Sequence, residues 1–332
     1  MLNYDFVDFI SLASMVVFGV THYRDSAIVK YQPTVEDGIS VDNRKLFFEY
    51  MHERYMIWLR RFKMKKPQPW TKNKILKEYK FTNTYRRLDR CSQFLLRHIK
   101  RARKKHDISD EEVAWTIILF RFINRIETFE IIGIPRMADF SIKKFCKKLR
   151  VLKDIEGKSV FTSAYITCQC SNKRDRIGNF EEMMGGIHRD WKKVWRVIRK
   201  AESMEAVYKQ LQQFYGLGQF NSYEICIDLC YTGVLPDKWR DDFANPGPGC
   251  KVGIDCIYPF STVSYHEAMR KLTDRQDKYF KEAGVEFRGE RLTLQDIEFN
   301  LCEFGKYFKL IKGVGKSRMR LKPVTPNDAK LY

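Results

Sequence analysis

Apolar residues recur at intervals of three and four along most of the chain, which is the spacing of one face of an α-helix. In residues 46–62 this apolar stripe is almost continuous, and Pro67 and Pro69 end it. The same periodicity predicts further helices at about 84–103, after Ser109, after Phe140, from about 189, over 204–214 and 222–231, and from Thr293 to about 311. The chain is therefore predicted to be all-α.

Helix caps and breaks refine this prediction. Thr71 can cap a short helix, residues 109–112 form a capping box, and Thr293 can cap the last helix. The β-branched and polar segment 157–170 could be a short strand or an irregular excursion. Residues 172–186 are rich in glycine, asparagine and charge, so they are the best boundary between two lobes.

The charge of the chain points to a polyanionic partner. The 332 residues carry a formal net charge of +20, while 44% of them are hydrophobic and 14% aromatic, so a real core accompanies the charge. Nucleic acid is favoured over a membrane surface or mere solubility. The basic residues gather in four runs, at 97–105, 143–150, 189–200 and 316–322, and these runs are the expected phosphate contacts.

The N-terminal segment argues against a membrane-spanning protein, and the cysteines argue against a zinc-binding one. The apolar segment 1–22 carries Asp5 and Asp8 and is too short to span a bilayer, so it is expected to dock on the core, and no membrane partner is expected. Nine cysteines lack zinc-site spacing and fit reduced thiols in a cytosolic compartment. Cys226 and Cys230 are expected to be small buried residues.

Polar residues are concentrated in the stretch 69–90, which also reads as helical. This mixture predicts a lined pocket or a nucleic-acid-facing surface, although an ordinary amphipathic helix is an equal alternative. On a continuous helix, Arg86 and Arg90 share a face and could grip a pyrophosphate, with the Asp89 carboxylate beside them. The candidate substrate-binding residues of this stretch are Trp70, Thr71, Asn83, Arg86 and Arg90.

Glycines at 216 and 218 join two predicted helices in the form of a helix-hairpin-helix element. Gly216, Gly218 and Gln219 could let backbone amides approach a DNA phosphate, or the glycines could only make a tight turn between helices. Residues 245–253 form a second glycine-rich loop, where Gly247, Gly249 and Lys251 could cradle a phosphate or simply shape a turn.

Residues 313–317 look like the end of a Walker A loop. Leu310 stands where that motif needs glycine, so a nucleotide-hydrolysing P-loop is not predicted.

Four carboxylates in apolar or basic surroundings could act as general bases, or could be ion-paired with nearby arginines. They are Asp89, Glu127, Asp228 and Glu303.

Several of these segments together resemble a known family. The matching residues are Pro69-Trp70-Thr71, Ile75-Leu76, Phe81-Thr82-Asn83, Tyr85-Arg86, Asp89-Arg90, Phe122-x-Asn124-Arg125-x-Glu127-Thr128, Gly216-Leu217-Gly218-x-Phe220, Asp228-Leu229, Gly247-Pro248-Gly249 and Leu301-Cys302-Glu303-Phe304. They resemble the predicted α-glutamyl/putrescinyl thymine pyrophosphorylases, whose helical module also occurs in 5-hydroxymethyluracil DNA kinases. After Cys-Glu-Phe this chain has Gly305, whereas members of that family have a charged residue at this position.

The resemblance implies a DNA glycosylase-like helical fold over residues 45–312, with an N-terminal extension at 1–44 and a basic tail at 313–332. It implies a bacteriophage transferase that replaces the pyrophosphate of 5-(pyrophosphoryloxymethyl)uracil in double-stranded DNA with a small amine, an amino acid or a polyamine, in the cytoplasm of an infected bacterial host. It adds Asn124 and Arg125 to the substrate-binding candidates and no metal ligand. Arg86, Arg90 or Mg²⁺ would stabilise the departing pyrophosphate, and the Cys302 thiolate could add to the pyrimidine ring.

Two rival functions stay open at this point. A DNA glycosylase would excise the modified base, and a non-enzymatic DNA-binding or kinase accessory domain would perform no chemistry.

Overall fold

The computed structural model describes residues 34–36, 38–165, 167–168, 175–315 and 319–323. This part of the chain is mostly helical, which confirms the all-α prediction. Its strands are a minimal antiparallel hairpin of β1 (Val35–Glu36) and β2 (Ile39–Ser40). No helix in the described ranges is long and apolar enough to cross a membrane. The predicted N-terminal docking segment lies outside the described residues.

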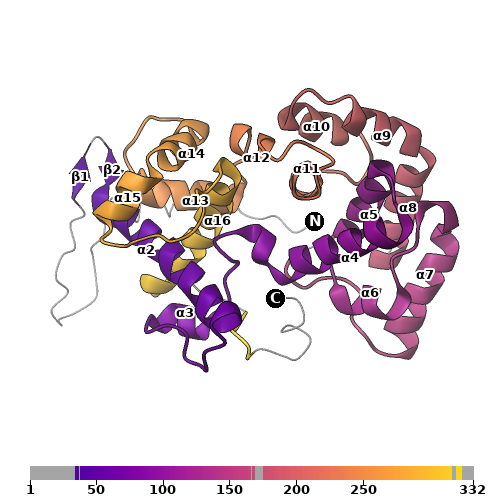
Figure 1. The fold of residues 1–332 in the computed structure, drawn as a ribbon, viewed down its shortest axis with the longest axis horizontal. Helices are drawn as coiled ribbons and strands as arrows, with labels where there is room; N and C mark the ends of the chain where they lie inside the picture. Colours follow the sequence, from indigo (N-terminus) through magenta and orange to yellow (C-terminus); the bar gives the residue numbers. More distant parts are fainter. Residues whose placement is uncertain (1–33, 37, 166, 169–174, 316–318, 324–332) are drawn as a thin grey trace.

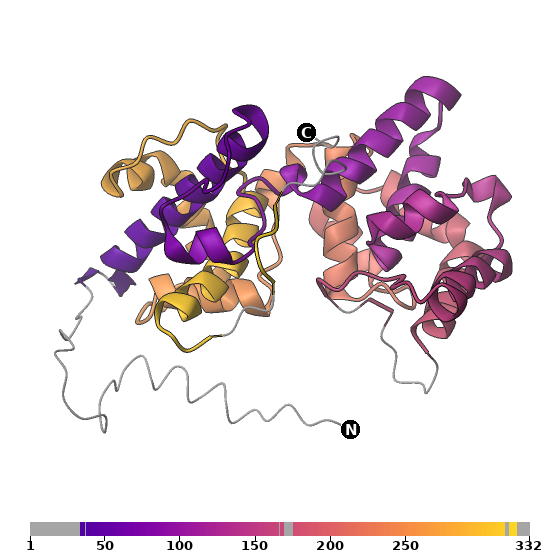
Figure 2. The ribbon, with the colours of Figure 1, turned by 90° about the horizontal axis from the view of Figure 1, so that it is seen from below.

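The helices gather into two groups in both ribbon views (Figures 1 and 2). The terminal group contains α2 (Val41–Trp58), α3 (Lys74–Glu78), α13 (Pro248–Ile257), α14 (Tyr265–Asp274), α15 (Gln276–Glu282) and α16 (Leu294–Ile311). The central group contains α4 (Arg90–His106), α5 (Asp110–Ile123), α6 (Ile126–Ile132), α7 (Ile142–Arg150), α8 (Arg176–Arg189), α9 (Trp191–Arg199), α10 (Met204–Leu211) and α11 (Gln219–Tyr231).

The chain crosses between the groups twice. The first crossing is the segment 82–89, which contains a 3₁₀ turn at Arg86–Leu88. The second is the segment 232–247, which contains the short helix α12 (Trp239–Asp242). The predicted boundary at 172–186 is wrong, because most of it forms α8, which packs against α5, α7 and α9 inside the central group.

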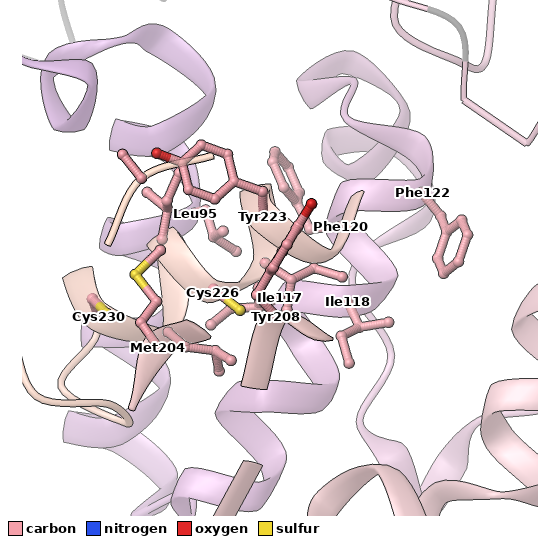
Figure 3. Close-up of a cluster of buried hydrophobic side chains, with 14 of the residues drawn as sticks. Leu95, Ile117, Ile118, Phe120, Phe122, Met204, Tyr208, Tyr223, Cys226 and Cys230 are labelled. Atoms are coloured by element: carbon pink, nitrogen blue, oxygen red, sulfur yellow. The ribbon is translucent and has the colours of Figure 1, made fainter. Parts of the chain in front are cut away.

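The core of the central group is built around α5. Almost every residue of α5 is buried, and the helix packs against α11 and α4. Figure 3 shows side chains from α5, α10 and α11 meeting in one apolar cluster, with Leu95 from α4 beside them. Cys226 and Cys230 lie within this cluster as small buried residues, as predicted.

The terminal group is held together by the close approach of α13 and α16. A Cβ atom added at Gly253 would overlap the backbone of Leu301, and one added at Gly249 would overlap the Cys302 Sγ. From the other helix, Gly305 would place its Cβ 3.2 Å from Val252. Glycine at these positions lets the two backbones pack closely.

Several predicted caps are confirmed. Thr293 and Asp296 form a reciprocal capping box at the start of α16. At the start of α5 the Ser109 side chain accepts the Glu112 amide, but the Glu112 carboxylate accepts the Met137 amide, so only half of the predicted box forms. Helix α3 is capped by Asn73 instead of Thr71. The described residues of the 157–170 segment are irregular, not a strand.

The predicted continuous helix over 84–103 is wrong. Asp89 has extended backbone angles, φ −72° and ψ 151°, and serves as the N-cap of α4. The α-helix therefore begins at Arg90, and Arg86 belongs to a separate 3₁₀ turn. Arg86 and Arg90 consequently do not share a helical face, which removes the basis for the predicted two-arginine grip.

Candidate active site between the two groups of helices

The first crossing segment is fixed by hydrogen bonds within itself and to α16. The Asp89 Oδ1 accepts the Asn83 backbone amide at 2.9 Å and its side-chain Nδ2 at 2.8 Å. The Asn300 side chain, on α16, donates to the Thr84 carbonyl at 2.8 Å. Burial raises the pKa of Asp89 above its usual range, although the hydrogen bond from Asn83 and the charge of Arg86 oppose that rise. Asn83 and Asp89 therefore act together as a buried polar unit.

Arg86 reaches from this segment into the central group. Its guanidinium makes two hydrogen bonds with the Glu224 carboxylate of α11 and lies 4.4 Å from the centroid of the Phe299 ring of α16. A guanidinium can pair with a carboxylate in its plane and stack on an aromatic ring with its face, so both contacts suit arginine. Arg86 thus links the crossing segment to one helix from each group.

A second arginine extends this link into a buried ion-pair network. Arg121 donates from Nε and Nη2 to Asp228 at 2.5 and 2.7 Å, and its Nη1 lies 2.9 Å from Glu224. The network of Arg86, Glu224, Arg121 and Asp228 balances two positive with two negative charges. Asp228, predicted as a catalytic base, is therefore occupied by Arg121 and only 1% exposed.

The prediction omitted Arg121 and Glu224, although the sequence carried a signal for both. Arg121 stands alone inside the apolar run 113–123, and Glu224 and Asp228 are four residues apart on a largely apolar helix. Charges in such positions are buried by the packing of their neighbours, so they require partners of opposite sign.

Glu303 ties α16 to the crossing segment. Its Oε2 accepts the Thr82 backbone amide at 3.2 Å, and its Oε1 pairs with Lys306 one turn further along α16. Burial lowers the pKa of Lys306, but the charge of Glu303, with a smaller contribution from Asp89, outweighs burial and raises it. The structure therefore brings together Asn83, Asp89 and Glu303, three of the predicted site residues.

Two further residues of α16 face the same region. Burial raises the pKa of Glu298 to about 8, against the charge of Arg86 and hydrogen bonds from the Gly247 amide and the Cys250 thiol. Burial, with the nearby carboxylates Glu303 and Glu298, raises the pKa of Cys302 to about 12. Cys302 is therefore protonated at neutral pH, which opposes its predicted role as a thiolate nucleophile.

Glu127 lies at the edge of this region. Its Oε1 accepts from Arg90 at 2.8 Å, and its Oε2 is 3.6 Å from Arg125. Burial raises the pKa of Glu127, but hydrogen bonds from its own backbone amide and from Arg90 outweigh that effect and hold it below the usual value. Asn124 ends α5 in the left-handed conformation, with φ of 44°. Glu127 is thus a half-exposed, paired carboxylate.

Trp70 and Thr71 have structural partners elsewhere in the terminal group. The Trp70 Nε1 donates to the Lys66 carbonyl at 2.7 Å, and Arg60 donates to the Trp70 carbonyl at 2.7 Å. The Thr71 Oγ1 accepts the Asn73 amide at 3.0 Å. These contacts stabilise the turn before α3.

The glycine turn between α10 and α11 gives its two glycines different roles. Gly216 has φ of +91°, and the Met183 side chain fills the space where its Cβ would lie. Gly218 is the exposed N-cap of α11, with open space at its Cβ position, and exposed Gln219 begins the helix. Only Gly218 therefore has room for an approaching ligand.

The second glycine loop divides in a similar way. Gly247 is the N-cap of α13 and has open space around it, whereas Gly249 packs against Cys302. Lys251 is exposed, with its Nζ 5.3 Å from the centroid of the Tyr265 ring. Within the described part of the chain, no group of three or more His, Cys, Asp or Glu side chains is arranged to hold a metal ion.

Comparison with known proteins gives one consistent result. Residues 42–316 match the family model described as the helical domain of 5-hmdU DNA kinase. A curated relative described as a 5-hmdU DNA kinase, from Bacillus phage SP10, is 28% identical over 286 residues. The match covers 79% of this chain and 44% of that protein, so the chain spans less than half the length of the relative. No solved structure gives a significant match.

Proposed function

Since the chain belongs to the family of the 5-hmdU DNA kinase helical domain, we propose that it acts on hydroxymethyluracil-containing phage DNA. In this proposal it is a transferase that replaces the pyrophosphate of 5-(pyrophosphoryloxymethyl)uracil with an amine. The observation that carries the proposal is the largely buried polar cluster of Asn83, Asp89 and Glu303 between the two groups of helices, where Glu303 bonds the Thr82 amide beside the Asn83–Asp89 pair. A cluster of this kind suits proton transfer out of contact with water.

DNA would bind by its phosphates first. The net charge of +20 favours a polyanion. The turn between α10 and α11 is proposed as a helix-hairpin-helix element in a glycosylase-like fold, with the exposed Gly218 amide and Gln219 at the positive end of α11. Lys251 near the start of α13 would contribute a second phosphate contact, whereas the Gly247 amide already donates to Glu298.

The modified base would then leave the stack and enter the region between the groups, which would bring its exocyclic carbon from the major groove to these side chains. The incoming ammonium loses a proton, the amine nitrogen forms a bond to the exocyclic carbon, and the carbon–oxygen bond breaks with its electrons passing to pyrophosphate. Asp89 or Glu303 would take the proton, since Glu303 is buried and Asp89 is half-buried. Lys306 and Arg90 would offset the charge of the departing pyrophosphate. Asp228 and Glu127, both ion-paired, would orient the arginines.

Mass spectrometry of nucleosides tests this function directly. Hydroxymethyluracil DNA that has been pyrophosphorylated is incubated with the chain and either glutamate or putrescine, and we expect a new nucleoside whose mass equals that of the amine adduct. Asp89→Asn and Glu303→Gln should bind this DNA but lose transfer, whereas Glu286→Gln, which changes an exposed carboxylate paired with Arg288, should keep it. Transfer at wild-type rates by both site variants would refute the assignment of these residues.

The two rival functions give different products in the same assay. A glycosylase would release the free base and leave abasic sites. A DNA-binding accessory domain would leave the nucleosides unchanged. Its affinity for DNA would fall with rising salt in the same way as that of the transferase. In the proposed organisation, residues 45–312 form the catalytic domain and act in the cytoplasm of an infected bacterium.

A further inference from the structure

A pair of side chains on α16 has hydrogen-bonding capacity that the described residues do not fill. Gln295 is fully buried, and neither its Nε2 nor its Oε1 has a partner within the described ranges. Glu298 is also buried, and its Oε2 has no described partner either. Because they are three residues apart on a helix, these two side chains project from the same face.

The surroundings of Glu298 are partly aromatic and lie at the meeting point of the two groups. Phe299, the next residue of α16, lies under the Arg86 guanidinium and 6.2 Å from the Tyr223 ring of α11, measured between ring centroids. Glu298 faces the Gly247 amide and the Cys250 thiol on α13, and Tyr223 on α11. Glu298 therefore lies beside the second crossing segment, and Gln295 lies one turn before it on α16.

An unfilled buried amide is costly, so a group that pairs with it would bind there with a gain in free energy. A glutamine amide offers one donor and one acceptor side by side, and a protonated carboxyl group offers another donor. At neutral pH the Glu298 carboxyl is mainly protonated, because burial raises its pKa to about 8. A pyrimidine-2,4-dione presents the complement, two carbonyl acceptors on either side of an N3–H donor.

We propose that Gln295 and Glu298 bind the Watson–Crick edge of a uracil-type base that has left the DNA stack. The proposal deepens the DNA-modifying function above and rests on it. Gln295 pairs with the N3–H and one carbonyl of the base, and Glu298 donates to the other carbonyl. Because both side chains are covered in the free protein, the segment Phe243–Gly247 beside them has to move to admit the base.

Paired binding measurements separate base contacts from phosphate contacts. The full chain is titrated at fixed salt with a duplex carrying one 5-hydroxymethyluracil opposite adenine, and with the same duplex carrying a tetrahydrofuran abasic site there. Gln295→Leu should weaken binding to the hydroxymethyluracil duplex by about 10- to 100-fold and leave binding to the abasic duplex unchanged. Glu298→Leu should act in the same direction, and Glu298→Gln, which keeps a donor, should restore most of the affinity.

Stability provides a readout that separates this role from a structural one. Gln276 is the matched control, because its buried amide is fully paired, with bonds to the Thr273 and Leu292 carbonyls and from the Leu292 amide. Gln276→Leu should lower the urea midpoint of unfolding, whereas Gln295→Leu should leave it unchanged or raise it.

The outcomes distinguish failure of this inference from failure of the function. If the wild-type chain binds neither duplex, the proposed function fails. If it binds both, and Gln295→Leu keeps the wild-type affinity ratio or destabilises the fold as Gln276→Leu does, the base-binding role is refuted while the function stands.

Discussion

The buried ion-pair network predicts that two destabilising substitutions will compensate each other. Arg121→Met removes one positive charge and leaves Asp228 without its partner. Arg121 and Asp228 are 2% and 1% exposed, so the lost pairing is not replaced by water. Removing one member of a buried pair costs about 3–5 kcal/mol, because the remaining charge is buried and uncompensated. Asp228→Leu should cost a similar amount, because it leaves Glu224 as the only carboxylate paired with Arg121 among the described residues.

The double variant should recover most of that loss. Removing Arg121 and Asp228 together takes out one charge of each sign and leaves the bidentate pair of Arg86 with Glu224 intact. Replacement of a complete buried ion pair by apolar groups of similar volume is commonly near neutral. We therefore expect the double variant to lie within about 2 kcal/mol of wild type, with a coupling energy of several kcal/mol.

Urea unfolding followed by circular dichroism at pH 7 measures all four proteins of this cycle. Each single variant should shift the midpoint strongly, and the double variant should return towards wild type with an unchanged slope. Additive losses in the double variant would refute the reasoning, because they would mean that each side chain stabilises the fold by its own packing and not through the other's charge.

Three further predictions concern other parts of the chain. Gly218→Val should weaken duplex binding while the unfolding midpoint stays unchanged, whereas Gly216→Val should destabilise the fold because Met183 fills the Cβ position; equal midpoints for the two would contradict the geometry. Burial raises the pKa of Glu298 to about 8, above its unfolded value, so its contribution to the unfolding free energy is complete below about pH 4.5 and is lost as pH rises through 8. Glu298→Gln should therefore flatten the decline of stability between pH 5 and 9 by a few kcal/mol, and an unchanged pH profile would contradict the burial argument. Glu127→Gln should cost less than about 1 kcal/mol in urea unfolding, because Glu127 and Arg90 are half-exposed, and a loss as large as that of Arg121→Met would be inconsistent with solvent screening.

Local signals in the sequence predicted local structure well. Ser109 and Thr293 mark the starts of α5 and α16 because an N-cap needs only a side-chain oxygen and a nearby amide. Periodicity failed at Asp89, where apolar spacing continued across a helix start. Asp89 stands at the N-cap position, but its side chain accepts from Asn83 and not from the amides of α4, so the helix start depends on the fold around Asn83.

The candidate site was predictable only in part. Asp89 and Glu303 were proposed because a carboxylate among apolar or basic neighbours is conspicuous in a sequence. Gln295 was not, because an uncharged glutamine on a helix is ordinary until its burial is known. The glycines at 249 and 253 were equally ambiguous: close helix packing and phosphate binding require the same missing side chain, and only the position of α16 separates them.

The path of the chain between the two groups has a consequence for folding during synthesis. The rings of Phe47 and Phe48 on α2 pack against Phe304 and Phe280, which the ribosome delivers only after the whole central group has been made. Until then α2 exposes apolar surface to the cell, whereas the central group can close on itself. The region between the groups is completed last, by α16, so a chain truncated before residue 294 would retain the central helices and lack the site.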